Sequence, residues 1–443
     1  MRGAIAAGHP LTAEAGARIL REGGNAVDAL LGAAFTAFVT EGPLTGPTGG
    51  GFALVHEPSG STTMLDCFFG VPTTRLGEME ELVIDFGDAG TQDFHVGEGS
   101  VAVPGLLAGL EDIHVRFATR AWADLVEPAV RLAERGFERD EQRETLHLIL
   151  EGILQREDGG RRIYGDPARV HTRDVCETLE AVRADGAAMV AGLIPEYADD
   201  LRAYRVLEMS PLEIRTRGRV IRSTPSQGGG VVQRILEVLS GHADEPPLES
   251  EARAVADGYG QLGSGPLPGT THISVVDADG LAAGLSSTLG SGSGVFRGGT
   301  QLNKMLGELD VIGPDEKEPG DRLASMMTPT LVLESGRPQL VIGSAGSVRL
   351  AGAIAQVTWR FLLGMHVADA IRAPRLHVEG TTLHLEGGWA EDEVAALPAS
   401  WDVNRWGALN LFFGGVQAVE STTAGGFEAA GDPRRGGIGI VVP

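Results

Sequence analysis

The chain contains few of the residues that mark several common kinds of site. Its 443 residues include two cysteines, Cys67 and Cys176, which lie far apart and outside any Cys-x-x-Cys or Cys/His spacing. This pattern argues against a zinc site and against a disulfide framework, so two free thiols are expected. We therefore expect the protein to hold no metal and to need no cofactor.

Lysine is also scarce, with Lys304 and Lys317 as its two occurrences, and acidic residues outnumber basic ones by 60 to 36. The net charge of −24 repels phosphate backbones, so a nucleic acid is not an expected partner. No lysine follows a glycine-rich stretch at the spacing of a phosphate-binding loop, which argues against nucleotide binding.

Long hydrophobic runs are missing as well. The most apolar stretch, residues 26–39, is too short to span a bilayer, and the first residues show no run of signal-peptide length. From these absences we expect a cytoplasmic protein without a membrane partner. The hydrophobic fraction of 42% is ordinary for a globular chain of this length.

The most informative segment that is present covers residues 269–290 and reads GTTHISVVDADGLAAGLSSTLG. Asp279-Gly280 is a strong turn signal because glycine accepts the positive φ that tight hairpin turns require. Alternating residues on both sides predict two antiparallel strands. A turn centred near Asp279 places Thr270 opposite Thr288, within one position of register.

This pairing suggests one specific chemistry. Cleavage between Gly269 and Thr270 would give Thr270 a free α-amine beside its own hydroxyl, which is a known nucleophile and base combination. An α-amine has a pKa near 8, so it can accept a proton at neutral pH without a histidine. The same residues also fit the start of an ordinary strand, because β-branched side chains favour strands.

The remaining elements alternate between strands and helices. Asn25 is expected to cap a buried helix. A loop of small residues, 344–347, precedes a helix and could direct several N–H groups at an anion, although it also fits a plain turn. We expect residues 242–267 to be an exposed segment. The predicted helices cover residues 12–20, 26–39, most of 106–204, 231–240 and 350–363, and the predicted strands cover residues 52–56, 62–69, the start of 100–110, 219–223, 330–334 and 339–343. The pattern favours an α+β protein with stacked sheets and helices outside.

Motifs along nearly the whole chain resemble those of the γ-glutamyltransferases (glutathione hydrolases), a family of N-terminal-nucleophile hydrolases. In chain order they are GHPLTAEAGARILREGGNAVDA, GPTGGGFALV, SVAVPGLLAGL, WADLVEPAVRLAERGF, TPSQGGG, TTHISVVDADG, SMMTPTLVL, GSAGS, ADAIRAPR and GDPRRGG. Each motif is weak alone, but the ordered set is specific.

The resemblance implies a four-layer αββα sandwich forming one composite domain. It also implies a precursor that cuts itself between Gly269 and Thr270, giving a heterodimer of fragments 1–269 and 270–443; a further dimer of these heterodimers is left open. The freed Thr270 would attack a small amide with support from Thr288, the N–H groups of Gly346 and Ser347 would hold the oxyanion, and water or an amino acid would accept the acyl group.

The substrate-binding positions depart from the family pattern. The family's arginine for the glutamyl carboxylate corresponds to Phe68, and its asparagine after the second threonine corresponds to Gly290. The amino-group contacts correspond to Met305 and Glu308. Of a Ser-Ser pair, Ser325 is kept and the second position is Met326. Replacing a bidentate arginine by phenylalanine leaves a carboxylate unpaired, at a cost of about 2–5 kcal/mol.

Three hypotheses follow. In the first, the chain is a self-processing amide hydrolase or acyltransferase that acts on a γ-glutamyl or similar small amide, with Arg297, Arg322 or Arg349 supplying the missing charge. In the second, it is an acylase for another acyl group, such as a glutaryl, an oxamoyl or a biosynthetic intermediate. In the third, it is an uncleaved, non-catalytic binding homologue.

Overall fold

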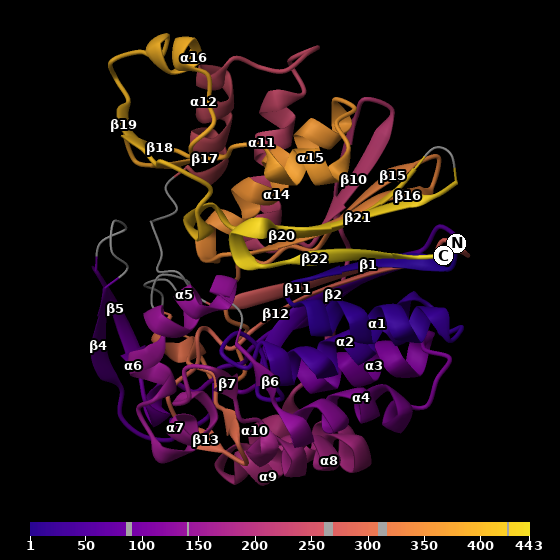
Figure 1. The fold of residues 1–443 in the computed structure, drawn as a ribbon, viewed down its shortest axis with the longest axis vertical. Coiled ribbons are helices and arrows are strands. Elements are labelled where there is room, and N and C mark those ends of the chain that lie inside the picture. The colour runs from indigo at the N-terminus through magenta and orange to yellow at the C-terminus, as the bar shows by residue number, and fades with distance from the viewer. Residues whose placement is uncertain (86–90, 140, 261–268, 309–316, 423–424) are drawn as a thin grey trace.

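Two antiparallel sheets lie face to face at the centre of the molecule (Figure 1). The computed structural model describes residues 1–85, 91–139, 141–260, 269–308, 317–422 and 425–443. In spatial order the first sheet comprises β22 (Ile438–Val442), β1 (Gly3–Ala7), β11 (Thr270–Asp277), β12 (Ala282–Thr288), β2 (Gly50–His56), β3 (Thr62–Cys67) and β8 (Leu207–Met209). The second comprises β21 (Phe427–Gly431), β20 (Gly415–Ser421), β16 (Arg337–Ala345), β15 (Thr330–Glu334), β10 (Arg219–Ser223) and β9 (Leu212–Thr216). Segments from both sides of Thr270 therefore supply strands to both sheets.

Helices cover the outer face of each sheet, which completes four layers (Figure 1). The first sheet is covered by α1 (Pro10–Arg21), α2 (Ala26–Thr40) and α3 (Leu106–Phe117), with α4 (Trp122–Arg135) packed on α2. The second is covered by α11 (Gln227–Leu239), α14 (Leu350–Leu362) and α15 (Val367–Arg372), with α12 (Leu248–Tyr259) packed on α11. The predicted αββα sandwich is confirmed.

Smaller elements surround this sandwich. A mostly helical region holds α5 (Glu141–Ile149), α6 (Glu151–Leu154), α7 (Asp158–Tyr164), α8 (Cys176–Asp185), α9 (Val190–Leu193) and α10 (Ala198–Ala203). Short strands form the pairs β4 (Glu80–Asp85) with β5 (Thr91–Val96), β6 (Phe137–Glu138) with β7 (Arg169–Val170), and β13 (Phe296–Arg297) with β14 (Thr300–Gln301). Three further strands, β17 (Leu376–Glu379), β18 (Thr382–Leu385) and β19 (Asp402–Arg405), lie near α16 (Glu391–Ala395). Single 3-10 turns occupy 98–100, 173–175, 186–189, 195–197, 305–307, 347–349, 411–413 and 433–435.

Helix α2 shows how local sequence sets up the core. The Asn25 side chain accepts from the Asp28 N–H at 2.8 Å, while the Asp28 carboxylate accepts from the Asn25 N–H at 2.9 Å, which forms a reciprocal cap. All residues of α2 are buried, as its apolar composition predicts, because the helix lies between the first sheet and α4.

Three details of the sequence-based prediction are wrong. Residues 100–105 form no strand beyond one bridge between Gly70 and Val103, because the Asn303 side chain bonds both peptide groups of Ala102. Helix α11 starts at Gln227, four residues before the predicted start, with Ser226 as its cap.

The third error concerns the segment expected to be exposed. Residues 248–259 form helix α12, whose apolar side chains are buried against α11, although acidic residues and prolines nearby suggested a loop. Residues 261–268 of the same predicted segment lie outside the described residues.

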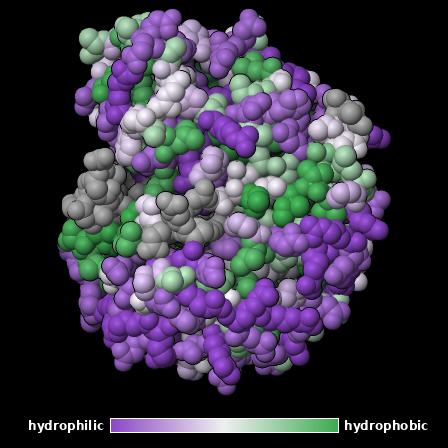
Figure 2. All heavy atoms as spheres, in the orientation of Figure 1, coloured by the Kyte–Doolittle hydropathy of each residue, from purple (hydrophilic) through white to green (hydrophobic). Residues whose placement is uncertain are grey.

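The distribution of hydrophobic and hydrophilic residues on the visible surface follows these layers. In Figure 2, hydrophilic side chains cover the helical region at the bottom, whereas hydrophobic ones gather at the level of the two sheets. Within the described ranges, none of the helices has the length and apolar character needed to cross a bilayer.

Candidate active site

Thr270 is the first residue of β11, and its register partner on β12 is Thr288. The turn that fixes this register contains Gly280 at a φ of 85°, as expected for the Asp-Gly pair. Thr270 and Thr288 are 3% and 4% exposed, so both hydroxyls lie in the interior at the end of the hairpin. The predicted pairing is confirmed.

Hydrogen bonds hold the peptide that precedes Thr270. The Thr288 hydroxyl donates to the Gly269 carbonyl oxygen, and the Gly269 N–H donates to Ser291 Oγ at 2.9 Å. Thr288 Oγ1 in turn accepts from the Gly290 N–H at 2.8 Å. The carbonyl between Gly269 and Thr270 is thus oriented and polarised by a hydroxyl donor.

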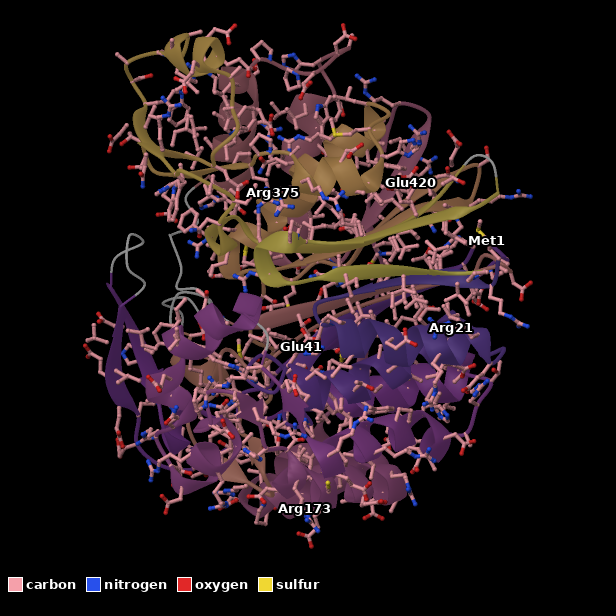
Figure 3. All side chains as sticks on the ribbon, in the orientation of Figure 1. Met1, Arg21, Glu41, Arg173, Arg375 and Glu420 are labelled. Atoms are coloured by element: carbon pink, nitrogen blue, oxygen red, sulfur yellow. The ribbon has the colours of Figure 1, made fainter. Side chains whose placement is uncertain are left out.

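The neighbouring Thr271 anchors the strand on its other face. Its hydroxyl donates to Glu41 Oε2 at 2.6 Å, and Glu41 also accepts from Thr12 at 3.1 Å. Glu41 lies at the end of α2, on the helical side of the first sheet (Figure 3). Because successive side chains of a strand point to opposite faces, this anchor directs Thr270 toward the second sheet.

A first pocket opens beside Thr270 on the β12 side. We call it the methionine pocket, and its volume is about 350 Å³ including its mouth. It is lined by Phe68, Thr270, Thr288, Met305, Glu308, Ser325, Met326, Met327, Ser347, Val348 and Leu350. The structure therefore gathers eight of the residues singled out from the sequence around one cavity.

Gly346 and Ser347 form a turn between β16 and α14. Gly346 has a φ of 122° and Ser347 a φ of 60°, so both adopt conformations that favour glycine. Ser347 lines the methionine pocket and Gly346 directly precedes it, which places the turn next to Thr270. Their use as an oxyanion hole stays a prediction.

The left-handed conformation of Ser347 gives a stability prediction. A non-glycine residue in this region costs roughly 1–2 kcal/mol. Ser347→Gly is therefore expected to raise the free energy of unfolding by about 1 kcal/mol. Ser347→Ala, which keeps the strained Cβ, should not, and chemical denaturation of both variants checks this. A glycine variant less stable than the alanine variant would contradict the strain.

Phe68 forms an apolar wall of the pocket. Its ring stacks on Phe52 with centroids 5.4 Å apart and packs edge-on against Phe69 at 4.9 Å, and the residue is 1% exposed. Its backbone N–H donates to Asp66, which fixes the turn after β3. No charge is available at this position for a substrate carboxylate.

One residue of the pocket lining, Glu308, belongs to an internal ion pair. Lys304 Nζ donates to Glu308 Oε1, and both side chains are 1% exposed. Nζ also lies 4.4 Å from the centroid of the Phe94 ring. The carboxylate that the resemblance assigns to a substrate amino group is therefore engaged by an ammonium of the protein itself.

Gly290 packs against two residues of the pocket lining. A Cβ at this position would lie 2.8 Å from Met305 Sδ and 3.1 Å from Glu308 Oε1, and the φ of 62° also favours glycine. An asparagine, as in the family pattern, would displace both neighbours. Met305 and the Lys304–Glu308 pair thus occupy space that the pattern gives to polar contacts.

Ser325 and Met326 close the pocket from the side of the second sheet. Ser325 Oγ accepts from the Met327 N–H at 3.1 Å, and the Met326 backbone packs tightly against Gly228, where a Cβ would lie 1.8 Å from the Met326 carbonyl oxygen. The start of α11 therefore fixes this wall, with a hydroxyl and a thioether facing the cavity.

The arginines considered as substitutes for the missing charge do not line this pocket. Arg297 pairs with Glu98 and Glu196 at 3.2 and 2.8 Å. Arg322 donates to the Phe68 carbonyl oxygen at 3.0 Å and lies on Tyr204. Arg349 pairs with Glu379 at 3.4 Å and lies on the Phe412 ring.

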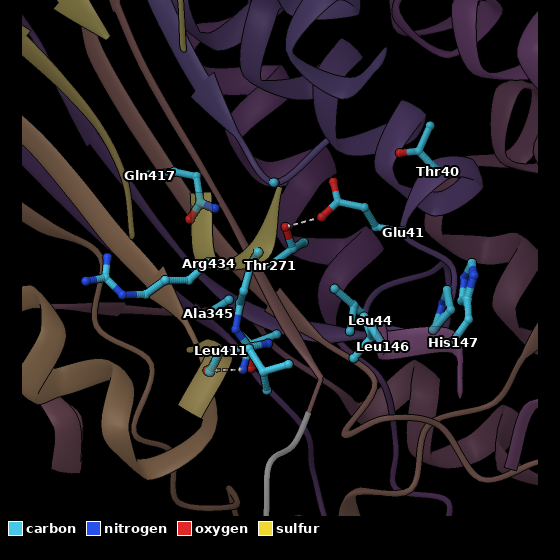
Figure 4. A pocket seen from close by; sticks show the side chains of 14 residues that line it. Thr40, Glu41, Leu44, Leu146, His147, Thr271, Ala345, Leu411, Gln417 and Arg434 are labelled. Carbon is cyan, nitrogen blue, oxygen red and sulfur yellow. Dashed lines mark hydrogen bonds between the residues drawn. The ribbon is translucent and has the colours of Figure 1, made fainter. Parts of the chain in front are cut away.

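A second pocket lies on the opposite side of Thr270. We call it the arginine pocket, and its volume is about 640 Å³ including its mouth. Figure 4 shows Gln417, Ala345 and Leu411 on one side of it and Glu41, Leu44 and His147 on the other. Its lining comprises Gly8, Thr40, Glu41, Pro43, Leu44, Leu146, His147, Thr270, Thr271, Ala345, Leu411, Gln417, Arg434 and Arg435.

Thr270 lines both pockets, and the 345–347 turn spans their boundary. Ala345 faces the arginine pocket and Ser347 faces the methionine pocket. A carbonyl held at this junction would place one half of an amide in each cavity. The arrangement suits attack by the Thr270 hydroxyl on such a carbonyl.

His272, two residues along β11, is not available as a base. Its Nδ1 lies 2.8 Å from Ser286 Oγ and its Nε2 2.9 Å from Ser274 Oγ. Burial lowers the pKa of His272 to about 3, so the ring is neutral and internally bonded at neutral pH.

The structure also locates residues that sequence reasoning missed, namely Lys304, Glu41, Gln417 and Arg435. The sequence does contain a feature that could have singled out Lys304, because it is one of two lysines and stands four residues before Glu308.

Metal binding remains unassigned. Both cysteines are free, and in the described parts of the chain a possible chelating group is formed by His366, Glu420 and Glu428, whose ligand atoms lie within 4.8 Å of one another. His366 contacts both carboxylates at 3.3–3.5 Å, which an ordinary ion pair explains. The expected absence of a metal stays a prediction.

Comparisons with known proteins agree with this fold. The family profile described as Gamma-glutamyltranspeptidase matches residues 12–262 and 249–442. The glutathione hydrolase proenzyme of Escherichia coli (strain K12) is 26% identical, over 98% of this chain and 90% of its own length. The acylase ACY 1 proenzyme of Pseudomonas sp. (strain SE83) is 27% identical, over 90% of this chain and 86% of its own. The crystal structure of cephalosporin acylase from Bacillus halodurans superposes with a TM-score of 0.83 at 20% identity, covering 99% of this chain and 95% of that one.

Proposed function

Because this chain belongs to the gamma-glutamyltranspeptidase family, we propose that it is a self-processing amide hydrolase whose nucleophile is Thr270. It is an enzyme of the amide hydrolase and acyltransferase class. The observation that carries the assignment of Thr270 is its position at the junction of two pockets, directly after a carbonyl that accepts a hydroxyl donor. The expected product is a heterodimer of residues 1–269 and 270–443.

The geometry at Gly269 supports a processing step. The Thr270 hydroxyl attacks the Gly269 carbonyl carbon, an ester forms, the peptide C–N bond breaks, and the proton of the hydroxyl passes to the Thr270 nitrogen. The Thr288 hydroxyl donates to the oxygen on which negative charge develops. Water then hydrolyses the ester, which leaves a Gly269 carboxylate and a Thr270 with both hydroxyl and α-amine free.

Substrate turnover repeats this chemistry on an external amide. The α-amine accepts the hydroxyl proton as Oγ attacks the substrate carbonyl, and the N–H groups of Gly346 and Ser347 stabilise the oxyanion. The amine half leaves with a proton, and water releases the acyl group from Thr270 as an acid. An amino acid in place of water would make the enzyme a transferase.

Thr288 gives a direct test of the processing step. Removing one donor to a developing oxyanion costs about 10²–10³ in rate. We therefore expect Thr288→Val to slow the appearance of the two fragments by about 100-fold, as followed by denaturing electrophoresis. Ser287→Ala is the matched control, because the Ser287 hydroxyl bonds Thr45 at 2.8 Å instead. Equal processing rates in both variants would show that the Thr288 hydroxyl does not assist the cleavage.

The identity of the base predicts the pH profile. The α-amine must be unprotonated to act, so kcat/KM should rise with pH and level off above the pKa of an N-terminal amine, about 8. Since His272 is neutral throughout the range, no second limb near pH 6.5 is expected. A limb near pH 6.5 that disappears in His272→Gln would assign the base to the ring.

The second candidate function is that of an acylase for an uncharged acyl group. The ion pair of Lys304 with Glu308 and the ring of Phe68 favour an acyl group without charge over a γ-glutamyl group. A buried charge without a partner costs several kcal/mol, so a glutaryl carboxylate is disfavoured too, whereas a neutral oxamoyl or short alkanoyl group fits.

A panel of p-nitroanilides offered to the processed protein separates the two candidates. Release of p-nitroaniline from γ-glutamyl, glutaryl, oxamoyl and butyryl anilides is compared under identical conditions. Faster release from the neutral anilides supports the acylase. A preference for the γ-glutamyl anilide would instead establish the γ-glutamyl hydrolase and reject the neutral acyl pocket.

A further inference from the structure

Two consecutive arginines near the C-terminus have opposite environments. The guanidinium of Arg434 has acidic partners on both sides, Glu386 and Asp432. It also donates to the carbonyl oxygens of Ile371 and Ala373. Arg435 forms no ion pair with any described residue, and the one hydrogen bond that its side chain makes to a described residue runs from Nη2 to the Leu411 carbonyl oxygen at 3.2 Å. The first arginine is structural, whereas the second holds a charge that the protein itself leaves uncompensated.

The guanidinium of Arg435 is confined within the arginine pocket. Its aliphatic part lies on Gly415, where a Cβ would be 2.5 Å from Arg435 Cδ, and Nη2 would lie 3.5 Å from a Cβ on Gly346. The residue as a whole is half-buried, but Nε is inaccessible to solvent and donates to no acceptor in the described structure. The charge therefore sits beside the 345–347 turn, next to Thr270.

The charged groups near Arg435 in the described structure do not neutralise its guanidinium. Burial, assisted by the nearby charge of Arg349, lowers the pKa of Arg435 to about 10, so the side chain remains charged at neutral pH. Asp432 acts in the opposite direction, but its carboxylate is in contact with Arg375 and Arg434. A confined cation of this kind is costly unless an anion from outside completes it.

A second polar group in the same pocket also lacks a partner. Gln417 is 1% exposed, and its Oε1 accepts no hydrogen bond in the described structure. An amide oxygen in this state is suited to accept an N–H group from a ligand. Together, a guanidinium and an amide oxygen match a molecule that carries both a carboxylate and an amine.

We propose that the arginine pocket binds the amine half of the substrate and that Arg435 pairs with a carboxylate on it. The substrate class is an N-acyl amino acid or a related amide, with an uncharged acyl group in the methionine pocket and an anionic amine half in the arginine pocket. This inference rests on Thr270 being the nucleophile, because Thr270 is where the two pockets meet. In this arrangement the charge that fixes the substrate lies on the leaving group.

The test uses 4-aminobenzoate as a carboxylate-bearing amine and 4-aminobenzamide as its neutral counterpart. Calorimetry on the processed wild-type protein should give at least 30-fold tighter binding of the benzoate. Arg435→Met should abolish this preference and Arg435→Lys should retain part of it. Arg337→Met, which removes an exposed arginine at the far end of β16, is the matched control and should bind both amines as the wild type does.

A kinetic readout separates this inference from the proposed function. With N-butyryl derivatives of the same two amines, Arg435→Met should raise KM for the benzoate about 30-fold and leave kcat and the benzamide unchanged. An equal loss of activity on both substrates would assign Arg435 to oxyanion stabilisation or to the fold. If the wild type showed no preference for the benzoate over the benzamide, the proposed carboxylate site would be rejected. Tight benzoate binding without any hydrolysis would keep the anion site and reject Thr270 as nucleophile.

Discussion

Replacing Thr270 by alanine is expected to give a single chain of 443 residues that releases no amine from any amide. The alanine variant lacks the hydroxyl that attacks Gly269, so no new N-terminus forms, and it also lacks the nucleophile for substrate. Denaturing electrophoresis and the p-nitroanilide assay measure both losses in one preparation. The loss should be complete, because one atom serves both reactions.

Thr270→Ser is the matched control for this experiment. It keeps the hydroxyl and the main-chain contacts of Gly269 with Ser291 and removes one methyl group from a buried site. Processing should therefore proceed, and activity should be retained at a reduced level. An alanine variant that is still cut at residue 269 would place the nucleophile elsewhere.

Restoring charge to the methionine pocket should redirect the specificity of the enzyme. Lys304→Met removes the ammonium that now pairs with Glu308, which favours a substrate ammonium beside this carboxylate, and Phe68→Arg supplies a partner for a substrate carboxylate. Each truncated or restored buried charge contact is worth about 2–5 kcal/mol. The double variant is therefore expected to raise the ratio of kcat/KM for γ-glutamyl over butyryl p-nitroanilide by about 1000-fold.

A variant without the carboxylate provides the control. Adding Glu308→Gln to the double variant removes the group that binds the ammonium, so most of the gain should disappear while the cavity keeps its shape. Fragment formation reports that each variant has folded. An unchanged substrate ratio in the charged variants would mean that the methionine pocket does not receive the acyl group.

The hairpin around Thr270 could be predicted from the sequence because its determinants are local. Asp279-Gly280 fixes the turn, the alternation fixes the faces, and the register then pairs Thr270 with Thr288. Asn25 and Asp28 likewise determine the start of α2 without tertiary information.

Other features depend on distant contacts and could not be predicted in this way. Helix α12 becomes recognisable through its packing on α11, since its own sequence is acidic and follows two prolines. The pairing of Lys304 with Glu308 needs the 3-10 turn at 305–307 that brings the two side chains together.

The different partners of Arg434 and Arg435 could not be predicted from the sequence either. The two are adjacent and chemically identical, and only the positions of Glu386, Asp432 and Leu411 decide which one is neutralised. The resemblance to a family led to the prediction that Thr270 is the nucleophile, whereas the charged groups of both pockets were identified from the three-dimensional arrangement.

The mass and the N-terminal sequences of the purified wild-type protein test the central claim most directly. The account predicts two polypeptides, one comprising residues 1–269 and the other starting with Thr270 and ending at Pro443. A single intact chain of 443 residues after prolonged incubation at neutral pH would contradict it, because Thr270 would then have neither an α-amine nor a catalytic role.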